Sequence, residues 1–235
     1  MPQPKTPNRL ANLHRVRRFP DVLAIAPFSD VIEAVVHPPG SKSFTNRALV
    51  VAALAREGAS RLIGPLLADD TKAMRDCLRA LGVLIDDADD PWLVLGTGGR
   101  LETAPGPLDA RASGTTARFI AAMAALADGP VTVDGTARMR ERPISDLTDA
   151  LSSLGASTTT TGGCLPVTVE RRALHGGRVA VDGSRSSQFV SALLMLGPML
   201  EGGLELDLVD GVLVSRPYVI STIEVMRAFG ASVTT

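Results

Sequence analysis

Residues 41–58 read SKSFTNRALVVAALAREG, a polar start of serines and cations followed by an apolar run from Ala48 to Ala55. The same design returns as SGTTARFIAAMAALADG at residues 113–129 and as SSQFVSALLMLGPMLEG at residues 186–202. The closing glycines recur at intervals of 71 and 73 residues. A helix that is apolar nearly all round must be buried on most sides. We therefore predict three buried helices related by an internal repeat.

A second set of helices follows in step with the first. Its members are residues 70–82, 143–155 and 217–230, and each ends at a glycine where a left-handed helix cap is expected. Apolar residues recur at helical spacing, as at Met74 and Leu78, so these helices should bury one face only.

Short β-prone stretches fill the gaps between the helices. They predict strands at residues 31–36, 93–95, 131–134, 167–169, 178–181 and 204–208, with further β-prone residues at 83–85 and 231–233. The sequence thus predicts an inside-out α/β domain of three βαβαββ-type repeats, with buried helices and outer sheets. The third repeat is expected to be truncated, because it lacks the strand-and-turn tail of the first two.

The composition of the chain excludes several classes of function. The chain has 235 residues, 45% hydrophobic content and a formal net charge of −1, which fits a globular protein and argues against bulk nucleic-acid binding. Two cysteines and three scattered histidines show no metal-ligand spacing, so we predict no metal, no cofactor and a reducing, cytoplasmic location. The apolar runs fall short of the roughly 20 residues that a membrane span needs, so none is predicted.

The first 20 residues contain five cations, no acid and three early prolines. A transit-type segment is one interpretation, but the prolines and the lack of an apolar period favour a flexible extension. We therefore divide the chain into a basic extension, residues 1–30, and a single domain, residues 31–235.

Parallel buried helices would bring their N-terminal ends together. The segments 40–43, 112–115 and 184–188 would then line one site with backbone N–H groups and hydroxyls, which is suited to an anion. Arg47 lies on the same helical face as Ser43, and Arg118 is its equivalent in the next repeat.

Two Arg-Pro pairs add to this pattern. Arg142-Pro143 and Arg216-Pro217 begin the second helices, where proline at the first helical position is a common structural choice. Their repetition in register favours anion binding over solvated cations. The expected ligand is polyanionic.

At these residues the chain resembles the enolpyruvyl transferase family, in the branch that uses shikimate 3-phosphate. The resemblance lies in residues 39–49, 113–119, 138–144 and 182–194, with 215–218 beyond. It covers residues 31–235 and corresponds to the first of the family's two domains.

The resemblance implies a transferase. In its reaction the 5-hydroxyl of shikimate 3-phosphate attacks C2 of phosphoenolpyruvate, and the tetrahedral intermediate then loses phosphate, as part of aromatic amino acid biosynthesis.

The resemblance also implies residue roles. Lys42 would be catalytic, acting in proton transfer. The implied ligands of shikimate 3-phosphate are Lys42, Ser43, Arg47, Ser186, Ser187, Gln188, Ser215 and Tyr218. Those of phosphoenolpyruvate are Lys42, Gly114, Arg142 and Gln188, with Gly114 binding through its N–H because a side chain would block the approach.

Two departures from the family pattern affect these expectations. Many members have Asn-Ala where this chain has Ala112-Ser113, which bears on substrate affinity and glyphosate sensitivity. The family's second domain, which supplies a carboxylate base and further cations, is missing from this chain. We expect residues 1–235 alone to bind rather than to turn over, and the full-length protein to be a monomer.

The pattern has three rival interpretations. The related enzyme that uses UDP-N-acetylglucosamine follows a Lys-Asn pattern at its first helix, unlike Lys42-Ser43 here. An RNA 3′-phosphate cyclase would require a nucleotidylated histidine and a basic, aromatic face, whereas the chain has 3% aromatics. A non-catalytic remnant or binding module of the same fold stays open as the third.

Overall fold

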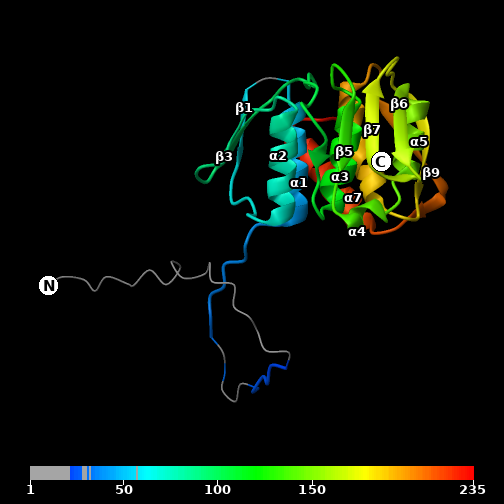
Figure 1. The fold of residues 1–235 in the computed structure, drawn as a ribbon. Helices are drawn as coiled ribbons and strands as arrows, with labels where there is room; N and C mark the ends of the chain where they lie inside the picture. Colours follow the sequence, from blue (N-terminus) through cyan, green and yellow to red (C-terminus); the bar gives the residue numbers. More distant parts are fainter. Residues whose placement is uncertain (1–21, 28–30, 32, 57) are drawn as a thin grey trace. The chain divides into compact units, whose positions relative to one another are not determined.

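The computed structural model of the chain describes residues 22–27, 31, 33–56 and 58–235. They belong to two units, which divide between Pro38 and Pro39. The unit from Pro39 to Thr235 contains every helix and strand of the described residues (Figure 1). Most of the predicted extension, residues 1–30, lies outside the described residues, so its flexibility stays a prediction.

The strand predicted at residues 31–36 is not formed in the described part of that segment. Residues 31 and 33–36 are in no strand, and the side chains of Val31 and Val35 are 98% and 87% exposed. The β-branched residues there raise the propensity for a strand, but a strand forms only when a neighbouring backbone takes up its hydrogen bonds. No described segment of the first unit provides one.

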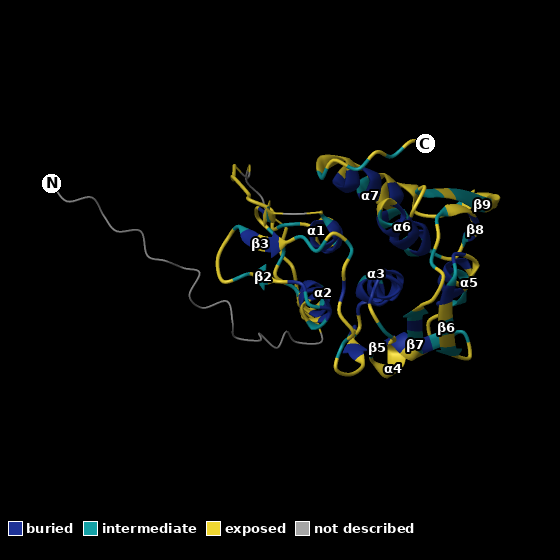
Figure 2. Cartoon of the chain, turned by 90° about the horizontal axis from the view of Figure 1, so that it is seen from above, coloured by how far each residue is buried: buried dark blue, intermediate teal, exposed yellow. Residues whose placement is uncertain are grey.

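The three buried helices are confirmed as α1 (Lys42–Leu54), α3 (Gly114–Ala124) and α6 (Ser187–Leu196). Their N-caps are Ser41, Ser113 and Ser186, and each serine side chain accepts a hydrogen bond from a backbone N–H of the first turn. In the view from above, α3 lies in the middle and is buried along its length (Figure 2).

The second set of helices consists of α2 (Asp69–Ala80), α5 (Ser145–Ser153) and α7 (Arg216–Ala228). Gly82, Gly155 and Gly230 follow them with φ of +86°, +91° and +87°, which confirms the left-handed caps.

The predicted role of the two prolines as first helical residues is wrong in detail. Pro217 is the second residue of α7, and Pro143 precedes α5. The physical reason at Pro143 is that neighbouring groups hold this segment outside the helix. Its carbonyl accepts a hydrogen bond from Arg118, and the N–H of Ile144 donates to the carbonyl of Gly163. A short helix, α4 (Ala137–Arg140), comes just before.

Three small sheets lie outside the helices. The first has the order β1-β3-β2, the second β4-β5-β7-β6 and the third β8-β9. Their strands are β1 (Ala59–Leu62), β2 (Ile85–Asp86), β3 (Trp92–Leu95), β4 (Leu108–Asp109), β5 (Val131–Asp134), β6 (Ala156–Thr161), β7 (Cys164–Arg171), β8 (Gly177–Gly183) and β9 (Leu204–Leu213).

The sheets follow the internal repeat. In the first two repeats, the hairpin after the second helix pairs antiparallel with the strand between the helices, so β3 pairs with β1 and β7 with β5. In the third repeat β9 pairs with β8 in parallel, and no described residue after α7 forms a strand. The three-repeat plan is confirmed, and the β-prone residues 231–233 form no strand because no hairpin partner is present among the described residues.

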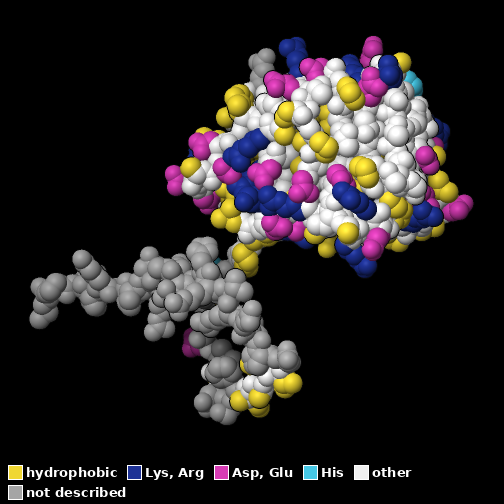
Figure 3. Space-filling model, in the orientation of Figure 1, with side chains coloured by type: hydrophobic (Ala, Val, Ile, Leu, Met, Phe, Trp, Pro, Cys, Tyr) yellow, Lys and Arg dark blue, Asp and Glu magenta, His cyan; other side chains and the backbone are white. Residues whose placement is uncertain are grey.

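The surface carries charges of both signs. On the face shown in Figure 3, cations and acids are intermingled rather than gathered into a field of one sign. Arg111 illustrates this, because its guanidinium pairs with both Asp69 and Asp76 of α2 at 2.7 Å. Among the described residues, no helix combines the length and apolar character required to cross a bilayer.

A buried cation ties α2 to the first sheet. The guanidinium of Arg75 lies over the ring of Trp92, 4.3 Å from its centroid, and pairs with Asp87, which also pairs with Arg79. Burial is the largest influence on Arg75 and lowers its pKa, so the neighbouring carboxylate is needed to offset the cost of keeping the charge.

Replacing Asp87 with asparagine should therefore lower the free energy of unfolding by about 2–3 kcal/mol, because it leaves the Arg75 guanidinium buried without a counter-charge. Urea unfolding measures the change. The control is Asp89→Asn in the same turn, an exposed residue that should change stability by less than about 0.5 kcal/mol. If both variants change the free energy of unfolding equally, the contacts of Arg75 with Asp87 and Trp92 do not stabilise the fold.

Candidate anion-binding site

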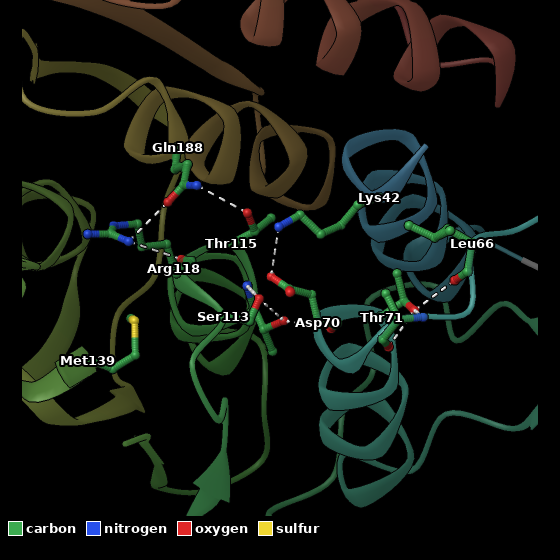
Figure 4. A network of polar contacts seen from close by, with 12 residues as sticks. Lys42, Leu66, Asp70, Thr71, Ser113, Thr115, Arg118, Met139 and Gln188 are labelled. Atoms are coloured by element: carbon green, nitrogen blue, oxygen red, sulfur yellow. Dashed lines mark hydrogen bonds and ion pairs between the residues drawn. The ribbon is translucent and has the colours of Figure 1, made fainter. Parts of the chain in front are cut away.

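The starts of the three buried helices lie around one region, as predicted (Figure 4). From α6, the Gln188 amide donates to the hydroxyl of Thr115 at the start of α3, with 3.1 Å between Nε2 and Oγ1. From α1, Lys42 reaches toward the same place, and its Nζ lies 3.3 Å from a carboxylate oxygen of Asp70 at the start of α2. The structure thus brings together residues that are up to 146 positions apart in the chain.

The charge of this region is positive. The first turns of α1, α3 and α6 contain no acidic residue, so the partial positive charge at each helix start is not offset there. Asp70 is the counter-charge for Lys42, but both side chains are partly exposed, and such pairs contribute little stability. A bound anion can therefore compete with Asp70 for the ammonium.

Arg118 connects three helix starts. One guanidinium nitrogen donates to the carbonyl of Gly114 (3.1 Å) and to Oε1 of Gln188 (3.0 Å), and the other donates to the carbonyl of Pro143 (3.2 Å). The residue is only 4% exposed, and its guanidinium lies 5.1 Å from the ring centroid of Phe189. All these partners are neutral. Burial lowers the pKa of Arg118 to about 10, so it stays charged at neutral pH.

The sequence prediction added Arg118 to the site only as the repeat equivalent of Arg47 and assigned it no contact of its own. The available signal was its spacing of four from Gly114, which puts the guanidinium beside a helix start. Asp70 was missed as a site residue. Its signal was its place in the first turn of α2, where a carboxylate is favourable.

Arg47, a predicted ligand of shikimate 3-phosphate, is 2% exposed. It donates to the carbonyl of Ser43 (2.9 Å), the carbonyl of Tyr218 (3.1 Å) and the hydroxyl of Thr222 (2.6 Å). Burial lowers its pKa to about 10. In this structure Arg47 joins the start of α1 to the start of α7, and its direct contact with a ligand stays a prediction.

Gly114 lies against two guanidinium groups. A Cβ built on this glycine would lie 2.6 Å from Nη1 of Arg142 and 2.7 Å from Nη1 of Arg118. Arg142 is exposed, and its guanidinium has no carboxylate partner among the described residues. Two cations beside a helix start form a place for a small anion, with Gly114 leaving room for them.

Replacing Gly114 with alanine should displace the Arg142 guanidinium, because it is the flexible, exposed one of the two. We expect a loss in affinity for phosphoenolpyruvate of about tenfold, equivalent to one weakened charged hydrogen bond. Stability should fall as well, because the buried guanidinium of Arg118 must also shift to make room for the Cβ. Isothermal titration calorimetry measures the affinity, and unchanged binding would contradict the assignment. Gly106→Ala is the control, because open space surrounds that glycine.

The third helix start carries the remaining predicted residues. The hydroxyl of Ser186 accepts from the N–H of Gln188 at 3.2 Å, Ser187 is buried, and Gln188 is held between Thr115 and Arg118. Gln188 therefore meets the start of α3, while Ser186 and Ser187 precede it at the start of α6, and their contact with a ligand stays a prediction.

Ser215 and Tyr218 lie at the start of α7. Ser215 is exposed and has φ of +53°, a strained conformation for a residue with a side chain. Tyr218 is half exposed, and its carbonyl accepts from Arg47. That bond links Tyr218 to Arg47, which also donates to the carbonyl of Ser43, and the N–H of Tyr218 donates to the carbonyl of Ser215.

Ala112 is exposed and brings no amide to the site. Among the described residues, no group of three or more His, Cys, Asp or Glu side chains is placed to hold a metal ion. Apart from the Asp70 carboxylate and the backbone carbonyls, the polar groups of the site are ammonium, guanidinium, hydroxyl, amide and backbone N–H groups, which can donate hydrogen bonds to an anion.

Comparison with known proteins gives a consistent set of relatives. The family model described as EPSP synthase (3-phosphoshikimate 1-carboxyvinyltransferase) matches residues 28–235. A 3-phosphoshikimate 1-carboxyvinyltransferase from Rhizobium leguminosarum bv. trifolii is 45% identical over 212 residues, which are 90% of this chain and 50% of that protein. One from Methanospirillum hungatei is 44% identical over 197 residues, 83% of this chain and 45% of that protein.

Solved structures agree with this result. An EPSP synthase from Acinetobacter baumannii superposes with a TM-score of 0.73 at 27% sequence identity, covering 84% of this chain and 44% of that one. The chain spans about half the length of the curated relatives that it matches.

Proposed function

Because the chain belongs to the EPSP synthase family, we propose that it takes part in transferring the enolpyruvyl group of phosphoenolpyruvate to shikimate 3-phosphate. The 5-hydroxyl oxygen forms a bond to C2 of phosphoenolpyruvate and loses its proton, while C3 gains a proton as the C2–C3 double bond opens. C3 then gives up a proton, the double bond re-forms, and the C2–O bond to phosphate breaks so that inorganic phosphate leaves. The observation that carries this proposal is that three helix starts without an acidic residue in their first turns lie together with three cations, Lys42, Arg118 and Arg142.

Both substrates are polyanions, and the site residues supply donors for them. Shikimate 3-phosphate would take the hydroxyls and backbone N–H groups at the starts of α1 and α6, together with Lys42. Its ring hydroxyls would meet Gln188, which Arg118 holds in place by donating a hydrogen bond to Oε1 of that amide. Ser43, Ser186, Ser187, Ser215, Tyr218 and Arg47 complete the proposed set.

Phosphoenolpyruvate would lie over Gly114. Arg142 is exposed and free of carboxylate partners among the described residues, so its planar guanidinium can bind a carboxylate or phosphate with two parallel hydrogen bonds. Lys42 and Gln188 would contact this substrate from the other side. Lys42, between the two ligands, is the group proposed to move the proton.

For residues 1–235 themselves, the proposed activity is binding of shikimate 3-phosphate. The carboxylate that the described residues place beside Lys42 is Asp70, and it is already paired with the ammonium. We expect binding without turnover, since a free base is needed to take the hydroxyl proton. Product formation by this polypeptide on its own would contradict that expectation.

Calorimetric titration with three ligands tests the proposal. Shikimate 3-phosphate should bind, shikimate should bind much more weakly because it lacks the phosphate, and UDP-N-acetylglucosamine should not bind. Failure of shikimate 3-phosphate to bind would refute the proposed site. Equal binding of shikimate would show that the helix starts do not recognise the phosphate.

A further inference from the structure

Asn46 carries a buried amide that has no hydrogen-bond partner. The residue is 0% exposed, and neither Nδ2 nor Oδ1 contacts a donor or acceptor among the described residues. Buried amides in folded proteins are nearly always paired, because an unpaired one loses its bonds to water without replacement. The arrangement of Asn46 in the ligand-free protein is therefore unfavourable and calls for a second state in which the amide is bonded.

The position of Asn46 on α1 indicates where such a bond could form. Asn46 is four residues after Lys42, so both lie on one face of the helix. Helical side chains lean toward the N-terminus, which directs the Asn46 amide over the turn that holds Lys42. Lys42 on this face points toward Asp70 and the start of α3 (Figure 4).

The start of α2 is fixed at the same junction. The hydroxyl of Thr116 on α3 donates to the carbonyl of Asp70, with 3.2 Å between the oxygens. Thr71 is fully buried and bonds to the carbonyls of Leu66 and Ala68. Asp70 is thus held by its backbone while its carboxylate faces α1.

A bound polyanion would change this junction. It attracts the Lys42 ammonium, which leaves the Asp70 carboxylate without its ion-pair partner and close to another negative charge. A neutral donor is then the best available replacement, because it can hydrogen-bond the carboxylate without competing for the ligand.

We propose that Asn46 is a positioning residue of the anion site, whose Nδ2 takes over the Asp70 carboxylate when the ligand draws Lys42 away. This inference rests on the proposed function for the identity of the ligand. On this proposal the Asn46 amide is unpaired in the free protein and hydrogen-bonded in the complex. Asn46 therefore couples the release of Lys42 from Asp70 to binding of the anion.

The test is Asn46→Leu, which has a similar shape and no polar atoms. It should raise the Tm of the ligand-free chain by about 2–4 °C, because it removes an unpaired buried amide. It should also weaken binding of shikimate 3-phosphate by about tenfold, because the Asp70 carboxylate then lacks a donor in the complex. The control is Thr148→Val on α5, a buried polar residue whose loss should leave affinity unchanged.

A double-mutant cycle with Asp70→Ala identifies the partner. In the Asp70→Ala background, Asn46→Leu should change affinity by less than about twofold, because there is no carboxylate left to hold. The proposal is overturned if Asn46→Leu lowers the affinity equally with and without the Asp70 carboxylate, or lowers it in neither case. A lower Tm with unchanged affinity also overturns it, since the amide would then be a satisfied structural group.

Inorganic phosphate is titrated in parallel as a second probe. If the wild-type chain binds phosphate but not shikimate 3-phosphate, the proposed function fails, and the effect of Asn46→Leu on phosphate affinity still decides the role of Asn46. If shikimate 3-phosphate binds and Asn46→Leu leaves its affinity unchanged, the proposed function stands and the Asn46 inference fails.

Discussion

Replacing Lys42 with methionine is expected to weaken binding of shikimate 3-phosphate by about 30- to 100-fold, equivalent to about 2–3 kcal/mol. Methionine retains most of the apolar stem and removes the ammonium. The loss arises because Lys42 is the mobile cation of the site, held in the free protein by a partly exposed pair with Asp70. Calorimetry at fixed ionic strength measures it.

Stability should hardly change in Lys42→Met, because a partly exposed ion pair contributes less than about 1 kcal/mol. The matched control is Lys72→Met, which removes one positive charge from an exposed position of α2. If Lys42→Met binds within threefold of the wild type, or if the control loses as much affinity, Lys42 does not contact the ligand.

Replacing Arg118 with lysine should lower both stability and affinity, although the charge is kept. A single ammonium cannot reach the carbonyls of Gly114 and Pro143 together with the amide of Gln188, which the guanidinium now bridges. Losing two of the three hydrogen bonds that this buried guanidinium makes should cost about 2–5 kcal/mol in the free energy of unfolding. Chemical denaturation measures this loss.

The affinity of Arg118→Lys for both substrates should fall as well, because Gln188 and the start of α3 would no longer be held together. Arg138→Lys is the control. Its side chain is 86% exposed and pairs only with Glu141 in the described residues, so it should change stability by less than about 0.5 kcal/mol. If Arg118→Lys changes stability and affinity no more than Arg138→Lys does, the three helix starts are positioned by other contacts.

The helices were predictable because several local signals agree. Ser41, Ser113 and Ser186 each precede an apolar run and do cap the three buried helices. The glycines after the second helices also adopt the left-handed conformation that the pattern indicates. Capping and burial act over a few residues, so a single sequence can reveal them.

The strands were harder to predict. The two-residue strands β2 and β4 are too short to show alternation, and β6 is mostly threonine. These strands form because a neighbouring strand hydrogen-bonds to their backbone. At residues 31–36 the sequence has β propensity, and the described residues of its unit offer no such neighbour.

The location of the site could be predicted from the sequence, but only some of its contacts could. The repeat register brought the helix starts together, and Gln188 does meet Thr115. Spacing places Arg118 and Arg47 beside the starts of their own helices, but it does not reveal that they connect distant segments. Their remaining acceptors lie elsewhere in the chain: the Pro143 carbonyl and Gln188 Oε1 for Arg118, and the Tyr218 carbonyl and the Thr222 hydroxyl for Arg47. Which buried arginine is a connector and which faces a ligand depends on packing between distant parts of the chain.

The central claim is that the starts of α1, α3 and α6 form one anion site. The most direct measurement is a titration of the ¹⁵N-labelled chain with shikimate 3-phosphate, followed through the backbone amide signals of Ser43, Gly114 and Ser187. The account predicts that all three signals shift together and fit a single Kd. Shifts confined to one helix start, or separate Kd values for the three amides, would contradict it.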